Sequence, residues 1–303
     1  MSKKVAFLGL GKMGGLMAKH LLEAGYSVTG YDPVAKAMAT AKKNGAKAAK
    51  TPAAAVKGAD IVCSSLPTPA VVRDVYLGSG GALKALQHGA VIFELSTSTV
   101  DLAREIAAAG KKKGVAFLDA PVSGSIPHLA NKQVAAMVGG DRKALKKNRD
   151  VLEAFCKSIT YMGPPGTGLI MKLVTNHILY IHHAGIAEGV AFGMKGGLKA
   201  DKMVKFLQES AVPNLLFYKG TEMAARDYSN VIAPVELSKK DLGLSVGEAN
   251  DLGVPVPLGV AALQQYVTAI ALGLRQADFN AVFESYLNAA GEKPKRQSKG
   301  RSR

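Results

Sequence analysis

The sequence contains no tryptophan, only two cysteines and only six histidines. Two cysteines cannot build a disulfide framework, and Cys63 and Cys156 both lie in apolar segments where we expect a packing role. His177, His182 and His183 share one segment, but they lack the four-residue spacing by which a helix presents two ligands to one metal ion. The sequence therefore predicts neither a disulfide scaffold nor a metal centre.

Long apolar runs are also missing. The sequence has no stretch of eighteen or more uncharged apolar residues, so we expect no membrane-spanning segment. The first apolar run, Val5–Leu8, is interrupted by Gly9 and Gly11 before it reaches the length of a secretory signal core. We therefore expect no leader before the first strand, and a cytoplasmic location.

Acidic residues are scarce: 23 Asp and Glu face 39 Lys and Arg, a net charge of +16. The basic residues are spread over the chain, as in Lys42–Lys43, Lys111–Lys113 and Lys146–Lys147, with a local excess at 291–303 that predicts a disordered basic tail. Weak, salt-sensitive binding of polyanions is one interpretation. Solubility and attraction of small anionic substrates is the other, so nucleic acid is not the partner we expect.

A glycine-rich turn follows the first strand. Strand Val5–Leu8 leads into the letters GLGKMG at 9–14, then into a helical pattern and a second strand, Ser27–Tyr31. In such a turn the first glycine permits the tight bend, the second lets a pyrophosphate approach the backbone, and the third allows the helix to pack on the strand. The phosphates would lie at the positive end of the helix dipole. The cofactor contacts predicted here are Gly9, Leu10, Gly11, Lys12, Met13 and Gly14.

Asp32 ends the second strand, where a carboxylate can accept hydrogen bonds from both ribose hydroxyls and would repel a 2′-phosphate. The pattern therefore predicts a dinucleotide site that prefers NAD. Lys36 lies close enough in sequence to keep NADP possible.

Strand and helix patterns alternate further along the first half. We predict strands at 59–66, 90–95, 117–120 and 133–138. This alternation predicts a doubly wound α/β domain of the Rossmann type with a mostly parallel sheet. Ligands bind beyond the carboxyl ends of such strands, so the loops at Leu66–Pro67, Ser96–Thr97 and Pro121 should border the site.

A long helix is predicted after two prolines, over 164–195. Lys172 and Asn176 lie one turn apart on its otherwise apolar surface. Spacing alone also fits a surface lysine and a core asparagine. Residues 196–290 are helical in pattern throughout, so we expect four parts: a nucleotide-binding domain over 1–163, the interdomain helix with Lys172 at the cleft, an all-α domain and the tail.

Four motifs together resemble the β-hydroxyacid dehydrogenase family, which includes 3-hydroxyisobutyrate dehydrogenase and the tartronate, succinic semialdehyde and glyoxylate reductases. They are GLGKMGGLMAKHL at 9–21, DAPVSGS at 119–125, GTGLIMKLVTNH at 166–177 and KDLGL at 240–244. The resemblance implies hydride transfer between NAD and a small β-hydroxy acid or semialdehyde, closure of the two domains, and a homodimer or homotetramer assembled through the helical domain.

The resemblance also implies residue roles. Lys172 would be the general acid and base, helped by Asn176, and burial or a nearby cation would have to lower its pKa from about 10.4. Ser123, Gly124 and Ser125 would bind the substrate carboxylate. Beyond the glycine-rich turn and Asp32, the cofactor would contact Leu66, Pro67, Ser96 and Lys240.

Departures from the family pattern leave the substrate open. Ser125 stands where the family usually has glycine, Lys132–Gln133 replaces Gly-Thr, and Glu94 replaces an aspartate. The side-chain preference would be set in the helical domain, for which we name Asn214, Phe217 and Tyr218.

Several alternatives stay open at this stage. The first is an NADPH-dependent reductase of tartronate semialdehyde, succinic semialdehyde or glyoxylate. The second is a non-catalytic dinucleotide- and polyanion-binding protein, although related nuclear proteins of that kind lack the lysine found here at 172. Thr175 argues against a 6-phosphogluconate dehydrogenase, which would have histidine there, and Lys172 argues against an imine reductase.

Overall fold

The computed structural model describes residues 3–210 and 215–295, except the side chains of 215–218. Asn214 therefore lies outside the described residues, as do the side chains of Phe217 and Tyr218. The chain forms two compact units, Met1–Lys172 and Leu173–Arg303. The boundary falls inside helix α10 (Thr167–Lys195), which continues from one unit into the other.

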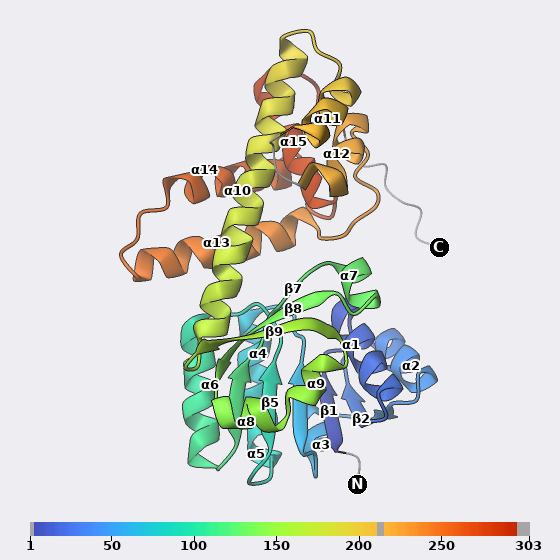
Figure 1. Cartoon of the computed structure of the whole chain (residues 1–303), viewed down its shortest axis with the longest axis vertical. Helices are drawn as coiled ribbons and strands as arrows, with labels where there is room; N and C mark the ends of the chain where they lie inside the picture. The colour runs from blue at the N-terminus through green and yellow to red at the C-terminus, as the bar shows by residue number, and fades with distance from the viewer. Residues whose placement is uncertain (1–2, 211–214, 296–303) are drawn as a thin grey trace. The chain divides into compact units, whose positions relative to one another are not determined.

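The N-terminal unit contains a nine-stranded sheet (Figure 1). Its strand order is β3-β2-β1-β4-β5-β6-β8-β7, and β9 pairs with β8. The first six strands are parallel, β8 is antiparallel to β6 and β7, and β9 is parallel to β8. The strands are β1 (Lys4–Leu8), β2 (Ser27–Tyr31), β3 (Lys47–Ala48), β4 (Ile61–Ser64), β5 (Val91–Glu94), β6 (Ala116–Asp119), β7 (Val122–Ser123), β8 (Val134–Gly140) and β9 (Cys156–Gly163). The predicted mostly parallel α/β sheet is confirmed.

The order of these strands reverses between β1 and β4. After β1 the chain builds outward through β2 and β3, then returns to the other side of β1 and continues through β4, β5 and β6. Two neighbouring strands at such a reversal have their following loops diverging, which opens a crevice beyond their carboxyl ends. The loops after β1 and β4 are therefore the natural ligand site of this unit.

Helices connect the strands of this unit. Several begin at a threonine whose hydroxyl accepts a backbone N–H three residues on, as Thr51, Thr68 and Thr99 do, and the first two are followed by proline at the first helical position. The helices are α1 (Lys12–Glu23), α2 (Ala35–Lys43), α3 (Pro52–Val56), α4 (Pro69–Leu77), α5 (Ala82–Ala85), α6 (Val100–Lys112), α7 (Ile126–Ala130), α8 (Arg142–Lys147) and α9 (Arg149–Glu153).

The core of the N-terminal unit lies along its central strands. Every residue of β4 and β5 is buried, as are Val5–Leu8 of β1, because both faces of a central parallel strand are covered. Phe7 and Phe93 are fully buried there. The sequence patterns did not predict β3, β7 or β9: the first two have two residues each, and only two of the eight residues of β9 are buried, so its apolar residues do not form a strand pattern.

The C-terminal unit is helical. Within 173–210 and 215–295 no strand is present, and Pro234 and Asp278 form an isolated bridge. Tyr180 and Tyr266 pack edge to face in its core, with ring centroids 5.7 Å apart. After α10 the helices are α11 (Ala200–Glu209), α12 (Leu215–Ala225), α13 (Val235–Asp251), α14 (Pro257–Ala271), the 3-10 helix η1 (Phe279–Val282) and α15 (Phe283–Ala289).

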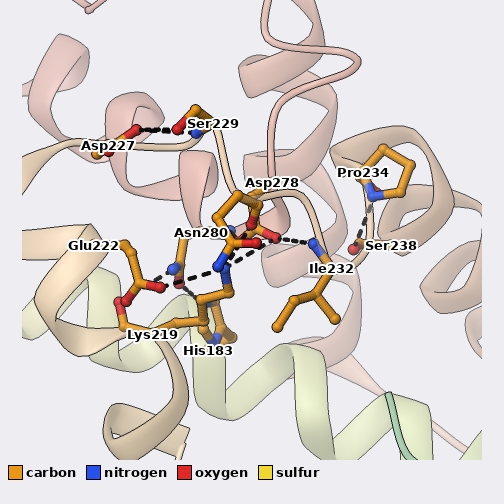
Figure 2. A network of polar contacts seen from close by, with 11 residues as sticks. His183, Lys219, Glu222, Asp227, Ser229, Ile232, Pro234, Ser238, Asp278 and Asn280 are labelled. Atoms are coloured by element: carbon orange, nitrogen blue, oxygen red, sulfur yellow. Dashed lines mark hydrogen bonds and ion pairs between the residues drawn. The ribbon is translucent and has the colours of Figure 1, made fainter. Parts of the chain in front are cut away.

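A buried lysine organises one side of this unit (Figure 2). Lys219 is 1% exposed, and its Nζ donates to the carbonyl of Asn230 at 2.7 Å. The carboxylates of Asp278 and Glu222 lie 3.5 and 3.6 Å from Nζ, and the backbone carbonyl of Lys219 accepts from Asn280. This network joins α12 to η1 and to the loop before α13, with opposite charges to offset the burial of the ammonium.

The first residues of the predicted tail are held to the C-terminal unit. Glu284 is fully buried and accepts from Arg226, from the hydroxyl of Tyr228 and from the backbone N–H of Lys295. Arg226 also donates to the carbonyl of Lys293. Residues 296–303 lie outside the described part of the chain.

Candidate active site

The glycine-rich turn leaves space at only one of its three glycines. A Cβ on Gly9 would lie 2.3 Å from the carbonyl oxygen of Ser65, and Gly9 has a φ of +88°. A Cβ on Gly14 would lie 2.0 Å from the carbonyl oxygen of Gly9. A Cβ on Gly11 would meet no atom within 4 Å. Gly9 and Gly14 are therefore required by packing, whereas Gly11 presents bare backbone at the start of α1, where a phosphate could approach.

Asp32 connects the end of β2 to this turn. Its Oδ2 accepts from the N–H of Leu10 at 2.7 Å, and its Oδ1 accepts from the N–H of Val34 at 2.8 Å. A carboxylate has about four acceptor positions, so both oxygens can still accept from a sugar hydroxyl. The residues present fit a dinucleotide: an open glycine, a helix start and a half-buried carboxylate are held together by a hydrogen bond from the backbone of the turn.

The loops after β4 and β5 are tied to each other. The N–H of Leu66 donates to Ser96 Oγ at 2.7 Å, and the N–H of Ser96 donates to Glu94 Oε1 at 3.1 Å. Leu66 also borders the glycine-rich turn, because a Cβ on Gly9 would lie 3.0 Å from its Cδ2. Three predicted cofactor residues, Gly9, Leu66 and Ser96, are thus part of one contiguous edge of the sheet.

Glu94 lies behind these loops. It is 1% exposed, and its Oε1 also accepts from the hydroxyl of Ser64 at 3.2 Å. Burial raises the pKa of Glu94 to about 7, against the opposing effect of the bonds from Ser96 and Ser64. In the sequence, Glu94 stands out only as a departure from the family pattern, and nothing there indicates that it supports two loops.

The predicted carboxylate-binding residues lie between β7 and α7. Ser123 ends β7, Gly124 has a φ of +136°, and Ser125 is the N-cap of helix α7. Ser125 faces His128: its Oγ lies 2.7 Å from His128 Nδ1, and its backbone N–H donates to the same nitrogen at 3.3 Å. The side chain that departs from the family pattern therefore caps a short helix through a histidine.

Lys172 lies on α10 at the end of the N-terminal unit, and Asn176 follows one turn later in the C-terminal unit. Asn176 is buried, and its Nδ2 donates to Asp241 Oδ2 at 3.0 Å. Lys240 Nζ lies 2.9 Å from Asp241 Oδ1 as an ion pair, without the angles of a hydrogen bond to that oxygen. Asp241 is a further residue of this cluster that was not selected from the sequence.

Pro67 lies in the loop after β4 and is exposed. Its predicted contact with the cofactor stays a prediction, as does the predicted cofactor contact of Lys240.

Three further features concern metal ligands, cysteines and membrane-spanning helices. Within the described residues, no group of three or more His, Cys, Asp or Glu side chains is arranged to hold a metal ion. Cys63 and Cys156 are buried and unbonded to each other, and burial raises the pKa of Cys156 to about 12. In the same part of the chain, no helix is both long and apolar enough to cross a membrane.

The strand order, the glycine-rich turn and Asp32 define a dinucleotide-binding α/β protein. Family models agree along most of the chain. Residues 4–163 match the NAD binding domain of 6-phosphogluconate dehydrogenase. Residues 166–286 match the domain described as NAD-binding of NADP-dependent 3-hydroxyisobutyrate dehydrogenase.

Individual proteins give the same result. An NAD-dependent L-serine dehydrogenase of Pseudomonas aeruginosa is 37% identical over 288 residues, covering 92% of this chain and 96% of that protein. A crystal structure of 3-hydroxyisobutyrate dehydrogenase from Salmonella typhimurium superposes with a TM-score of 0.84 at 29% identity, covering 93% of this chain and 99% of the other. The structure of Mycobacterium tuberculosis 3-hydroxyisobutyrate dehydrogenase with L-serine superposes with a TM-score of 0.83 at 32% identity, covering 93% of this chain and 98% of the other.

The chain belongs to the β-hydroxyacid dehydrogenase family, the family of the 3-hydroxyisobutyrate dehydrogenases. It is an NAD(P)-dependent oxidoreductase that acts on the CH–OH group of a hydroxy acid. The predicted fold class, enzyme class and cofactor class are therefore confirmed, while the roles of individual residues stay predictions.

Proposed function

We propose that this enzyme oxidises a small β-hydroxy acid, or reduces the corresponding semialdehyde, with Lys172 as the proton-transfer group and NAD as the preferred cofactor. The observation that carries the proposal is the pair on α10: Lys172 lies one turn before Asn176, whose amide nitrogen is held by buried Asp241. An amide whose nitrogen is fixed in this way has its oxygen directed away from Asp241. A lysine and an oriented amide oxygen on one helix face are suited to handling an alcohol proton.

The reaction separates a hydride from a proton. NAD, when held at Gly11 and Asp32, would supply the hydride acceptor for oxidation and the hydride donor for reduction. Lys172 Nζ accepts the hydroxyl proton as the C=O bond forms, and donates it back to the carbonyl oxygen in the reverse direction. Proton transfer of this kind contributes roughly 10²- to 10⁴-fold to the rate, provided that the neutral amine is available as the base.

The substrate carboxylate is assigned to the loop Ser123–Gly124–Ser125. A serine hydroxyl and backbone N–H groups form the strong charge-assisted hydrogen bonds that carboxylates accept. The Ser125 N–H already donates to His128 at 3.3 Å, so we assign Ser123 the leading role. L-Serine and 3-hydroxyisobutyrate are the first substrates to examine, because the relatives are named for them.

The test follows nicotinamide absorbance with NAD and with NADP against hydroxy acids and semialdehydes of three to five carbons. Lys172→Ala is expected to bind NADH normally and to lose about 10³-fold or more in turnover. Lys195→Ala is the matched control, since Lys195 is an exposed lysine at the other end of α10. Turnover by Lys172→Ala within tenfold of wild type would remove Lys172 from the mechanism.

The preference for NAD rests on Asp32. Its carboxylate is anchored by Leu10 and Val34 at the end of β2, where a 2′-phosphate would meet a fixed negative charge. Asp32→Asn keeps an oxygen acceptor and removes the charge. The ratio of kcat/KM for NADP to that for NAD is expected to rise by about tenfold or more. An unchanged ratio would contradict the assignment of the NAD preference to Asp32.

We also propose that the chain assembles into homo-oligomers through its C-terminal unit. Phe192 and Phe206 are 80% and 70% exposed on α10 and α11, which is unusual for a monomer's surface. A groove of about 370 Å³ lies on the same two helices, bordered by Ile181, Ile186 and Leu207. Sedimentation of wild type and of Phe192→Ser/Phe206→Ser tests this: the variant is expected to shift toward monomer, and a monomeric wild type would contradict the proposal.

A further inference from the structure

Asp119 holds the start of the long helix. This aspartate ends β6 and is fully buried. Its Oδ1 accepts from the N–H of Gly166 at 2.8 Å, and its Oδ2 accepts from the N–H of Leu169 at 2.9 Å. The first N–H groups of a helix have no partner within the helix, and a carboxylate there both satisfies them and complements the helix dipole. Both carboxylate oxygens are thus committed to the first turn of α10.

Two glycines make the contact tight. A Cβ on Gly168 would lie 2.5 Å from the carbonyl oxygen of Met137 and 2.6 Å from that of Asp119. A Cβ on Gly139 would lie 2.7 Å from Asp119 Oδ1 and 2.8 Å from the nitrogen of Gly168. The first turn of α10 therefore rests directly on β6 and β8, without a side chain between them, and it cannot shift without breaking several contacts.

The proposed reacting groups lie immediately beyond this contact. Lys172 is three residues after Leu169 on the same helix, less than one turn away. Ser123 is four residues after Asp119 along the chain, in β7, where it pairs with Ala135 of β8. The side chain of Asp119 thus fixes the start of α10, the helix that carries Lys172. The backbone that follows Asp119 leads to the loop assigned to the substrate carboxylate.

We propose that Asp119 is a positioning residue for proton transfer, because it sets the place of Lys172 relative to the loop Ser123–Gly124–Ser125. The proposal rests on the function proposed above for Lys172. The physical reason is that the rate depends on where the reacting groups lie, and displacement of one of them by about 1 Å can lower the rate roughly 10²-fold. Burial raises the pKa of Asp119, while the backbone N–H donors act in the opposite direction and favour the carboxylate.

The competing interpretation is that Asp119 only caps a helix and contributes to stability. The chain supplies a matched control for it. Asp141 is the N-cap of α8, and its Oδ1 accepts from the N–H groups of both Lys143 and Ala144, at 2.8 and 2.9 Å. It is also an aspartate that caps a helix of the same unit, but it is exposed, and no proposed reacting group follows on its helix.

The experiment compares Asp119→Asn with Asp141→Ala in the full chain, because both N–H groups at Asp141 donate to one oxygen that an asparagine would keep. An asparagine offers one oxygen acceptor, so one of the two N–H groups of α10 would face an amide NH₂ instead. Active sites are counted by NADH binding, and kcat is expressed per binding site. For Asp119→Asn we expect kcat per site to fall about 10- to 100-fold. The Kd for NADH should stay within about twofold of wild type, and Asp141→Ala should stay within about twofold of wild type in both kcat per site and Kd.

Two further readouts separate positioning from stability. Loss of stability alone would reduce the number of NADH sites and leave kcat per site unchanged. Misplacement of Lys172 should instead make the chemical step slower, so the deuterium isotope effect on kcat, measured with substrate labelled at the reacting carbon, should rise in Asp119→Asn. A kcat per site within threefold of wild type would overturn the proposal.

A second variant covers the case in which Asp119→Asn does not fold. Gly168→Ala keeps Asp119 intact and inserts a methyl group where 2.5 Å is available, so it should displace the same turn and lower kcat per site. Normal kcat per site in Gly168→Ala would overturn the proposal. The Lys172→Ala measurement is independent of both variants. If Lys172→Ala keeps its turnover, the proposed function fails. If Lys172→Ala loses turnover while Asp119→Asn and Gly168→Ala keep a normal kcat per site, only the positioning proposal fails.

Discussion

The amide of Asn176 donates from Nδ2 to Asp241 Oδ2 at 3.0 Å, between helices α10 and α13, and both side chains are buried. A carboxylate only accepts, so this contact determines which end of the asparagine amide faces it. Asn176 is thereby held in one orientation by a residue 65 positions further along the chain.

Removing Asp241 should therefore damage catalysis through Asn176. Asp241→Ala leaves the buried amide nitrogen without its acceptor, and we expect kcat/KM to fall about 10- to 100-fold, a cost of about 1–3 kcal/mol. Asn176→Ala should cost a similar amount, and the double variant little more, because neighbours in one network are not additive. Asp251→Ala, at an exposed position on α13, is the control. Additive losses in the double variant would contradict the coupling.

The glycines of the turn should separate binding from folding. Gly11→Ala places a methyl group in open space, so the unfolding midpoint should change little while the Kd for NADH rises by about tenfold or more. Gly14→Ala forces a Cβ to 2.0 Å from the Gly9 carbonyl oxygen, so it should lower the free energy of unfolding by about 1–3 kcal/mol or more. Thermal unfolding and NADH titration of both variants test this. Equal effects of the two substitutions on stability would contradict the assignment.

Glu94 should make stability depend on pH. Its pKa in the folded protein is about 7 against an ordinary 4.5, so the folded state holds the proton more tightly than the unfolded state. Stability is then highest below about pH 4.5 and decreases as pH rises through 7, by about 3 kcal/mol in total. Glu94→Gln keeps an oxygen for Ser96 and Ser64 and should lack this loss.

Urea unfolding at pH 5 and pH 8 measures that difference. The stability of Glu94→Gln relative to wild type should increase between the two pH values. Glu105→Gln, an exposed glutamate paired with Arg73, should show no such increase above pH 5. A pH-independent difference between Glu94→Gln and wild type would mean that Glu94 is ionised equally in both states.

Replacing the buried Lys219 alone should lower the free energy of unfolding more than replacing Lys219 and Asp278 together. Lys219→Met leaves the buried Asp278 carboxylate without its cation, and we expect a loss of about 3–5 kcal/mol. Adding Asp278→Asn should restore part of it, because the uncompensated charge is then gone. Lys199→Met, at an exposed lysine, should change stability by less than about 0.5 kcal/mol. No recovery in the double variant would contradict a charge-based account.

Much of the N-terminal fold could be predicted because its signals are local. The buried strands β1, β4 and β5 are short apolar runs bounded by glycine, proline and threonine, and the observed strands lie within the predicted ranges or start one residue outside them. β9 was not predicted because a strand with only two buried residues needs few apolar residues. The run after two prolines predicted the helix that the structure has at Thr167–Lys195.

The supporting residues of the site could not be predicted in the same way. Glu94, Asp119 and Asp241 are acidic residues in a charged chain, and an isolated acidic residue in a sequence most often indicates a solvated surface. Their importance comes from burial and from partners 30 to 65 positions distant. Sequence spacing carries no information about such contacts.

Local sequence was enough to predict the dinucleotide turn, the carboxylate at Asp32 on which the proposed NAD preference rests, and a lysine and an asparagine on one helix face. Each of these acts through backbone geometry within a few residues, which sequence fixes directly. Only tertiary packing shows which carboxylates hold the start of α10, the loops after β4 and β5, and the Asn176 amide. Those contacts exist only once strands and helices from distant parts of the chain have packed together and excluded water from the groups between them.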